Sequence, residues 1–239
     1  MMLSIEQKNF YEQNGFLRIK NVISEDDCKK LIKESDEFSN GFYTNYLDMH
    51  KYKGFKKMHT GKTLCDIADS ILEKRAIPIG SIFFFCKPNN KMENGSTWHQ
   101  DNYAGKASFG SYLNLALSLD EAREDNGALM VVPGSHKLGD LDCNPKANFS
   151  IDDKGRLYNS APIGNDCELP DMPILQLEYN RGDILLVHAH LVHKANKNKH
   201  PNKWRRTMYF VYVKEGEAFW PGFTAKRELL ERYDSAQHI

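Results

Sequence analysis

Two short groups of residues in this 239-residue sequence have the chemistry of metal ligands. The first lies in the run Trp98-His99-Gln100-Asp101. On an extended segment side chains alternate between two faces, so His99 and Asp101 would point the same way. An imidazole and a carboxylate side by side supply two of the three ligands of a mononuclear iron site of the 2-His-1-carboxylate type. Because a His-x-Asp pair often arises by chance, its value depends on a third ligand elsewhere in the chain.

The second group consists of His188, His190 and His193. His188 and His190 would share a face of an extended segment, whereas His193 could follow a bend. Each one alone is more often a hydrogen-bonded structural residue than a ligand. Together they could form a zinc site, although they lack the HExxH spacing that places two histidines on one helical face. Zinc would also leave His99 and Asp101 unexplained, and the spacing leaves the third ligand open.

A guanidinium beside a hydroxyl follows the histidine group. On a strand, Arg205 and Thr207 face one side and Arg206 faces the other. Such a pair suits bidentate capture of a carboxylate, and an iron(II) oxygenase that uses 2-oxoglutarate needs this group to hold the distal carboxylate of that cosubstrate. A surface ion pair would explain Arg205 equally well in isolation.

The elements that must position these residues are helices in the first third of the chain and short strands in the rest. The patterns predict helices over residues 4–14, 24–38 and 62–73. They predict strands over residues 16–19, 80–87, 111–119, 128–132, 174–178, 184–188 and 204–213. In the strand 111–119, leucines alternate with more polar residues, which indicates an apolar face packed on the helices and a polar face lining a cavity.

This order predicts a mainly β fold with a jelly-roll core (double-stranded β-helix, cupin-like) and N-terminal helices packed on one sheet. A doubly wound α/β fold would need strands that alternate with helices, which residues 80–213 do not show. We expect one domain, 1–239, made of a helical part (1–77), the core (78–215) and a C-terminal helix (216–239). The polar segment 137–172 is expected to be a long loop that could act as a lid.

The composition excludes several classes of function. Lys plus Arg equals Asp plus Glu at 32 each, so a general affinity for nucleic acid or anionic membranes is not indicated. The sequence has no apolar run near the roughly 20 residues of a membrane span. The first nine residues lack the features of a signal peptide, and the five scattered cysteines favour reduced thiols in a cytoplasmic protein.

The order of these motifs resembles the phytanoyl-CoA dioxygenase (PhyH) family of Fe(II)/2-oxoglutarate-dependent oxygenases, which includes ectoine hydroxylase-like enzymes. The opening IEQKNFYEQNGFLRIKNVISEDDCKKLI is similar to the family's N-terminal region, and WHQD to its iron-binding strand. The most specific match is NGALMVVPGSH. The run GDILLVHAHLVHKANKN followed by WRR is similar to the segment with the distal histidine and the arginine.

The resemblance implies that His99, Asp101 and His193 bind iron and that His188 and His190 do not. It also implies that Arg205 anchors 2-oxoglutarate beside Thr207. The loop before Arg205 is one residue longer than is usual, which keeps Arg206 as an alternative anchor. The usual His-Gly-Ser is replaced by His193-Lys194-Ala195, so a serine contact to the cosubstrate is missing.

Further cavity residues are expected on the two strands beside the site. Family alignment favours the odd-numbered face of the strand 80–87, with Ser81, Phe83 and Phe85 inward; the opposite register is the alternative. Phe83 and Asn114 would then lie near 2-oxoglutarate. Phe85 is expected near the substrate. The neighbours of the His-x-Asp pair, Trp98, Asn102 and Tyr103, are expected there as well.

The implied function is an oxidation that uses Fe(II), 2-oxoglutarate as cosubstrate and O₂, and that releases succinate and CO₂. Hydroxylation is the default outcome, because related halogenases replace the carboxylate ligand that Asp101 supplies here. We expect a small polar metabolite or an intermediate of natural product biosynthesis as substrate. The basic stretch 194–206 favours an anionic or zwitterionic molecule. The alternative is a non-catalytic or zinc-binding jelly-roll protein.

Overall fold

The computed structural model describes residues 2–88, 96–142, 149–151, 157–159, 167–221 and 227–233. Within these residues the strands form two sheets. The larger has eight strands in the order β1-β9-β4-β11-β3-β2-β7-β6, and the smaller has the order β10-β5-β8. The strand pairs described are antiparallel.

The helices are α1 (Ile5–Asn14), α2 (Glu25–Ser39), α3 (Lys53–Thr60), α4 (Lys62–Leu72) and α5 (Asn102–Gly105), with 3-10 turns η1 (Met49–Lys51), η2 (Glu124–Asn126) and η3 (Ser135–Leu138). The strands are β1 (Phe16–Ile19), β2 (Asn45–Leu47), β3 (Ala76–Cys86), β4 (Tyr112–Ser118), β5 (Leu129–Val131), β6 (Phe149–Ile151), β7 (Leu157–Asn159), β8 (Leu175–Leu177), β9 (Ile184–His188), β10 (His193–Ala195) and β11 (Arg205–Lys214).

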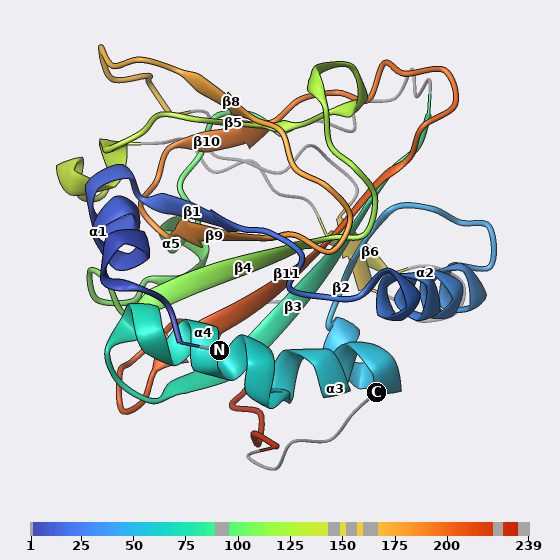
Figure 1. Ribbon diagram of the computed structural model, residues 1–239, viewed down its shortest axis with the longest axis horizontal. Coiled ribbons are helices and arrows are strands. Elements are labelled where there is room, and N and C mark those ends of the chain that lie inside the picture. Colours follow the sequence, from blue (N-terminus) through green and yellow to red (C-terminus); the bar gives the residue numbers. More distant parts are fainter. Residues whose placement is uncertain are drawn as a thin grey trace.

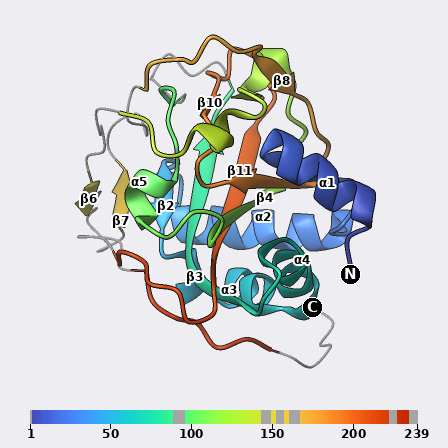
Figure 2. The same cartoon turned by 90° about the vertical axis from the view of Figure 1, so that its left-hand side faces the viewer.

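The molecule is layered. Figure 1 shows the eight-stranded sheet in the middle, α3 and α4 below it, and the three-stranded sheet above it. The view in Figure 2, turned by a quarter, keeps the same order of layers. This arrangement confirms the predicted mainly β fold with helices packed on one sheet. None of the described helices is long and apolar enough to cross a membrane.

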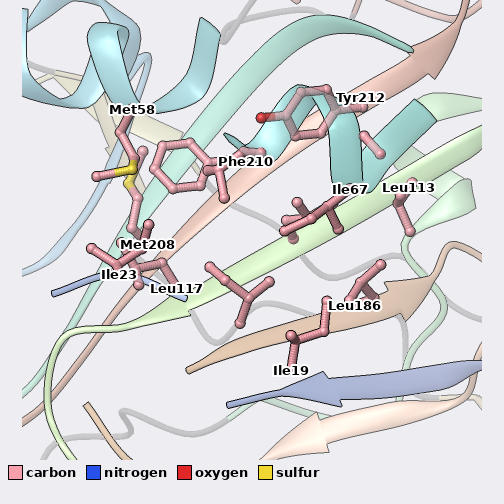
Figure 3. Packing of buried hydrophobic residues seen from close by; sticks show 14 of the residues in the cluster. Ile19, Ile23, Met58, Ile67, Leu113, Leu117, Leu186, Met208, Phe210 and Tyr212 are labelled. Carbon is pink, nitrogen blue, oxygen red and sulfur yellow. The ribbon is translucent and has the colours of Figure 1, made fainter. Parts of the chain in front are cut away.

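The main core lies between the large sheet and the helices (Figure 3). On β4, Leu113, Leu115 and Leu117 are fully buried and face this core, as the alternation of residues 111–119 predicts. Ile67 of α4 packs against them from the helix side. Burying a leucine contributes roughly 1.5–3 kcal/mol, so this face fixes which side of β4 turns toward the cavity.

The predicted inward face of β3 is wrong. Phe83 and Phe85 point to the helix side, where both meet the ring of Phe38 at centroid distances of 6.2 and 6.1 Å. The even-numbered Ile82 and Phe84 line the space between the two sheets instead. The aromatic residues of α2 and α3 supply partners for one face of β3, and these contacts decide the register.

The predicted C-terminal helix is also wrong for its described part. Residues 227–233 contain no helix, and their backbone runs beside β3. The amide of Glu228 donates to the carbonyl of Ile79 and that of Leu230 to Pro78, both at 2.9 Å. Backbone carbonyls of β3 thus accept the hydrogen bonds that the amides of this segment would donate within a helix. Residues 222–226 and 234–239 lie outside the described residues.

Only part of the predicted loop 137–172 lies within the described residues. The segment carries η3 at its start and the short strands β6 and β7, which extend the large sheet. Residues 143–148, 152–156 and 160–166 lie outside the described residues, so the lid stays a prediction. Cys28, Cys65 and Cys86 are buried thiols that form no disulfide, as expected, but Cys167 is disulfide-bonded, which the scattered spacing did not indicate.

Candidate active site

Three potential metal ligands meet where the two sheets face each other. Possible ligand atoms of His99, Asp101 and His193 all lie within 4.8 Å of one another. The Nε2 atoms of His99 and His193 are each 3.5 Å from a different oxygen of the Asp101 carboxylate. Two backbone hydrogen bonds of 3.0 Å between His99 and His193 form an antiparallel bridge. Two segments about ninety residues apart are thus brought into one three-donor group.

Both imidazoles are oriented by their other ring nitrogen. The Nδ1 atom of His99 donates to the carbonyl of Thr97 at 2.8 Å, and that of His193 to the carbonyl of Leu191 at 2.9 Å. A proton on Nδ1 leaves the Nε2 lone pair free and directed toward Asp101. Metal-binding histidines generally fix their tautomer in this way, so the donor set fits a divalent metal such as iron(II).

Burial favours the neutral form of the first histidine. It lowers the pKa of His99 to about 4, and the nearby His193 adds to this effect, while the Asp101 carboxylate opposes it. A neutral ring is the form that coordinates a metal. At neutral pH, protons therefore compete little for this ligand.

Asn114 of β4 supports the carboxylate. Its side-chain Nδ2 donates to Asp101 Oδ2, and its own Oδ1 is buried without a partner among the described residues. The sequence expectation placed Asn114 in the cavity beside the cosubstrate. The structure places it in the cavity lining, in contact with a candidate ligand. Partners of this kind hold a ligand in position and raise metal affinity.

The three candidate ligands line a cavity that encloses about 800 Å³, its open mouth included. Of the residues predicted for this site, Asn114, Tyr103 and Arg205 also line it. Its remaining wall comes mainly from β3, β4, β10 and β11, and from Leu129 of β5. The polar face of β4 thus lines a cavity, as predicted.

Arg205 is a buried cation at this cavity, with 2% of its surface exposed. Its Nη1 donates to Thr207 Oγ1 at 3.2 Å, and its Nη2 lies 2.6 Å from the sulfur of Cys86. Its Nε has no hydrogen-bond partner among the described residues. Gly127 packs close by, since a Cβ there would lie 3.1 Å from that Nε. A buried guanidinium with unused hydrogen-bonding capacity fits the carboxylate of a bound ligand.

Arg206, the alternative anchor, points away from the cavity. Its Nε and Nη2 donate to the two oxygens of Asp120 at 2.7 and 3.0 Å, and its guanidinium lies over the ring of Trp204. Asp120 therefore already occupies the two guanidinium N–H groups of Arg206 that would bind the carboxylate of a cosubstrate. The geometry favours Arg205 as the anchor.

The other histidines do not join the three-donor group. His188 accepts a hydrogen bond on Nδ1 from the amide of His190. The Nε2 of His190 lies 3.1 Å from an oxygen of Asp140. Within the described residues, His99, Asp101 and His193 are the only set of three or more such side chains close enough to share a metal. A zinc site made of the three clustered histidines is therefore not assembled.

Of the four residues expected near the substrate, only Tyr103 lies in the cavity lining. Tyr103 lines the cavity, and burial raises the pKa of its hydroxyl to about 12. Asn102 is turned away, toward His190 and the amide of Ala107. Trp98 is absent from the lining and lies under the ammonium of Lys194 at 4.8 Å.

The sequence expectations missed several residues of the lining, among them Ile82, Phe84, Tyr209 and Arg227. The period-2 pattern of a strand could have found Tyr209, since it shares a face with Arg205 and Thr207. Nothing local indicates Arg227, because it lies in the segment predicted as a helix.

The family model described as phytanoyl-CoA dioxygenase (PhyH) matches residues 35–207, well over half of the chain. Phytanoyl-CoA dioxygenase 1 of Oryza sativa subsp. japonica is 28% identical over 192 residues, which cover 80% of this chain and 60% of the rice protein. The chain thus spans less than two thirds of that relative. The 2-aminoethylphosphonate dioxygenase of the uncultured bacterium HF130_AEPn_1 is 25% identical over 93% of this chain and 87% of its own length.

A solved structure shows the same fold. The epimerase SnoN, in complex with Fe³⁺, alpha ketoglutarate and nogalamycin RO, superposes with a TM-score of 0.73 at 18% sequence identity. The match covers 90% of this chain and 84% of SnoN. The extent of the family match and the shared jelly-roll fold lead to one conclusion: this chain belongs to the phytanoyl-CoA dioxygenase (PhyH) family of Fe(II)/2-oxoglutarate-dependent oxygenases.

Proposed function

We propose that the protein hydroxylates a C–H bond of a small polar metabolite or biosynthetic intermediate, with release of succinate and CO₂ from 2-oxoglutarate. The observation that carries this proposal is the meeting of His99, Asp101 and His193 in one cavity with the buried Arg205. These three side chains would hold iron(II) and leave room beside it for a cosubstrate and for O₂. The buried guanidinium supplies the charge that a dicarboxylate cosubstrate requires.

Each residue has a separate task in this proposal. His99, Asp101 and His193 would hold iron(II), and Asn114 would keep the carboxylate in place. Arg205 would bind the distal carboxylate of 2-oxoglutarate, with Thr207 fixing its guanidinium. Iron(II) bound with 2-oxoglutarate and O₂ supplies an oxidant strong enough to remove a hydrogen atom from carbon. The apolar side chains of Ile82 and Phe84 would exclude water from that chemistry.

Hydroxylation is preferred over related outcomes because of the ligand set. A carboxylate at position 101 occupies the place that a halide would need, which argues against halogenation. Desaturation, ring closure and dealkylation begin with the same hydrogen removal and differ in the product. The SnoN structure is described as that of an epimerase, so the product must be identified as well as succinate.

The test is a screen for succinate release over a library of small metabolites with iron(II), 2-oxoglutarate and O₂. We expect at least one compound to raise succinate formation and to gain one oxygen atom by mass spectrometry. Asp101→Ala should abolish the activity, whereas Asp140→Ala, which removes a carboxylate outside the three-donor group, should retain it. Equal succinate formation by the Asp101→Ala variant, or a product without added oxygen, would contradict the proposal.

A further inference from the structure

A second guanidinium lines the same cavity. Arg227 belongs to the C-terminal segment that runs beside β3, and its side chain is half-buried in the cavity wall. The chemistry described above uses Arg205 for the cosubstrate and gives Arg227 no role. A cation that lines an active-site cavity is a candidate for substrate binding.

Backbone contacts carry Arg227 to this position. The amide of Glu228 pairs with Ile79, which fixes the chain directly after the arginine. The arginine side chain then crosses β3 at Gly80, where an added Cβ would lie 3.3 Å from Arg227 Cγ. Any larger residue at position 80 would crowd this crossing. The absence of a side chain at Gly80 thus leaves the space that the Arg227 side chain occupies.

The charge of Arg227 has no acidic partner within the described part of the chain. Its Nε donates to the hydroxyl of Tyr112 at 3.1 Å, and its Nη1 to the carbonyl of Trp220 at 3.4 Å. By contrast, Arg206 pairs with Asp120 and Arg232 with Asp69. Two neutral acceptors position the guanidinium without neutralising it. A half-buried cation in this state favours an anion from solution.

Arg227 and Arg205 enter the cavity at different positions along β3. Arg205 lies opposite Cys86 on β3, whereas Arg227 crosses the strand at Gly80, six residues or roughly 20 Å away along the strand. Tyr112, which holds Arg227, and Asn114, which holds Asp101, share a face of β4 about 7 Å apart. The two arginines thus reach the cavity from positions well separated along β3, and a ligand at Arg227 would lie close to the candidate metal ligands.

We propose that Arg227 binds an anionic group of the substrate, a carboxylate or a phosphorus oxyanion, and positions the substrate beside the candidate metal ligands. This inference rests on the proposed function. It defines the substrate class as small anions whose oxidised C–H bond lies a few bonds from the charged group. The lysines of the basic stretch 194–206 are absent from the cavity lining. Recognition of charge is thereby assigned to the cavity itself.

Calorimetric titration under anaerobic conditions tests this assignment without turnover. The full-length protein, loaded with iron(II) and 2-oxoglutarate, is titrated with acetate and, separately, with methylphosphonate. We expect at least one probe to bind at one site per chain, and the preferred probe identifies the anionic group. Arg227→Gln should weaken that binding by about tenfold or more, and Arg227→Lys by less.

A matched control separates local recognition from overall charge. Lys194→Gln removes the same charge near the cavity and should leave probe binding unchanged. Arg227→Gln should retain the wild-type affinity for 2-oxoglutarate, which shows that the variant is folded. Unchanged probe binding in Arg227→Gln, an equal loss in Lys194→Gln, or no binding to the wild type would overturn the inference. Succinate formation by the wild type reports on the proposed function separately, so the two can fail independently.

Discussion

Asp101 is the residue on which the site depends most. Its two carboxylate oxygens face the two imidazoles, and Asn114 holds one of those oxygens. The Asp101 side chain is 20% exposed, whereas His99 and His193 are nearly buried. The carboxylate thus lies at the accessible side of the group, and the two imidazoles form its buried wall. This arrangement leaves the accessible side for a cosubstrate and a substrate.

The two neighbouring arginines give a prediction at the residue scale. Arg205→Lys should weaken 2-oxoglutarate binding by about tenfold or more, because an ammonium replaces a fork that matches a carboxylate. Arg206→Lys should leave that affinity near the wild-type value, since Arg206 bonds to Asp120 outside the cavity. Calorimetric titration of the iron(II)-loaded protein under anaerobic conditions measures both. A larger loss in Arg206→Lys would assign the anchor to Arg206.

At the scale of elements, β3 separates the core from the cavity. In its second half, Ile82 and Phe84 face the cavity, and Phe83 and Phe85 face the aromatic residues of α2 and α3. The register with β11 supports this division, since Phe84 lies opposite Thr207 and Ile82 opposite Tyr209. One strand thus contributes both to stability and to the active site, through opposite faces.

This division predicts different effects for two adjacent phenylalanines. Phe83→Ala should destabilise the protein by about 3–5 kcal/mol, because it leaves a cavity among packed aromatic rings. Phe84→Ala removes a side chain from the cavity wall and should cost about 1 kcal/mol or less. Urea denaturation followed by circular dichroism compares the two. The reverse order of stability would restore the inward face expected from the family alignment.

The elements also show where sequence reasoning succeeds. Leucines alternate with polar residues in β4, so its two faces are visible in the sequence. In β3, three phenylalanines stand in succession at 83–85, and alternation disappears. Only the helices that pack on the strand decide its register. The conformation of residues 227–233 likewise depends on backbone pairing with β3, a contact about 150 residues away that no local pattern encodes.

At the scale of the whole molecule, helices, large sheet and small sheet are stacked, and the cavity lies between the sheets. The order of helices and strands predicts this layering because each apolar face needs a partner. The spacing of the motifs, together with the family resemblance, predicted that His99, Asp101, His193 and Arg205 would meet in one place, and the structure brings them to one cavity. The spacing could not predict Arg227, because the side chain reaches the cavity only after the C-terminal segment has paired with β3.

Buried histidines between these layers make stability depend on pH. Burial lowers the pKa of His59 to about 3, and its Nε2 bonds to the carbonyl of Val211. Below the unfolded pKa of about 6.5, the unfolded chain binds a proton that the folded protein rejects. Stability is therefore lost as the pH falls from about 6.5 toward 3, by about 1.4 kcal/mol per pH unit for this ring.

His59→Gln should remove this contribution while keeping a donor for Val211. Between about pH 6 and pH 5, the free energy of unfolding should fall less steeply in the variant than in the wild type. The two slopes should differ by about 1.4 kcal/mol per pH unit. Urea denaturation at several pH values measures the slope. Identical slopes in the variant and the wild type would show that His59 is not held neutral by the fold.

The proposed function requires that His99, Asp101 and His193 bind iron(II). Anaerobic titration with iron(II), followed by metal analysis of the desalted protein, tests it most directly. We predict one iron per chain in the wild type, loss of tight binding in His193→Ala, and retained binding in His188→Gln, which alters a buried histidine outside the group. Retained iron in His193→Ala together with loss in His188→Gln would contradict the account.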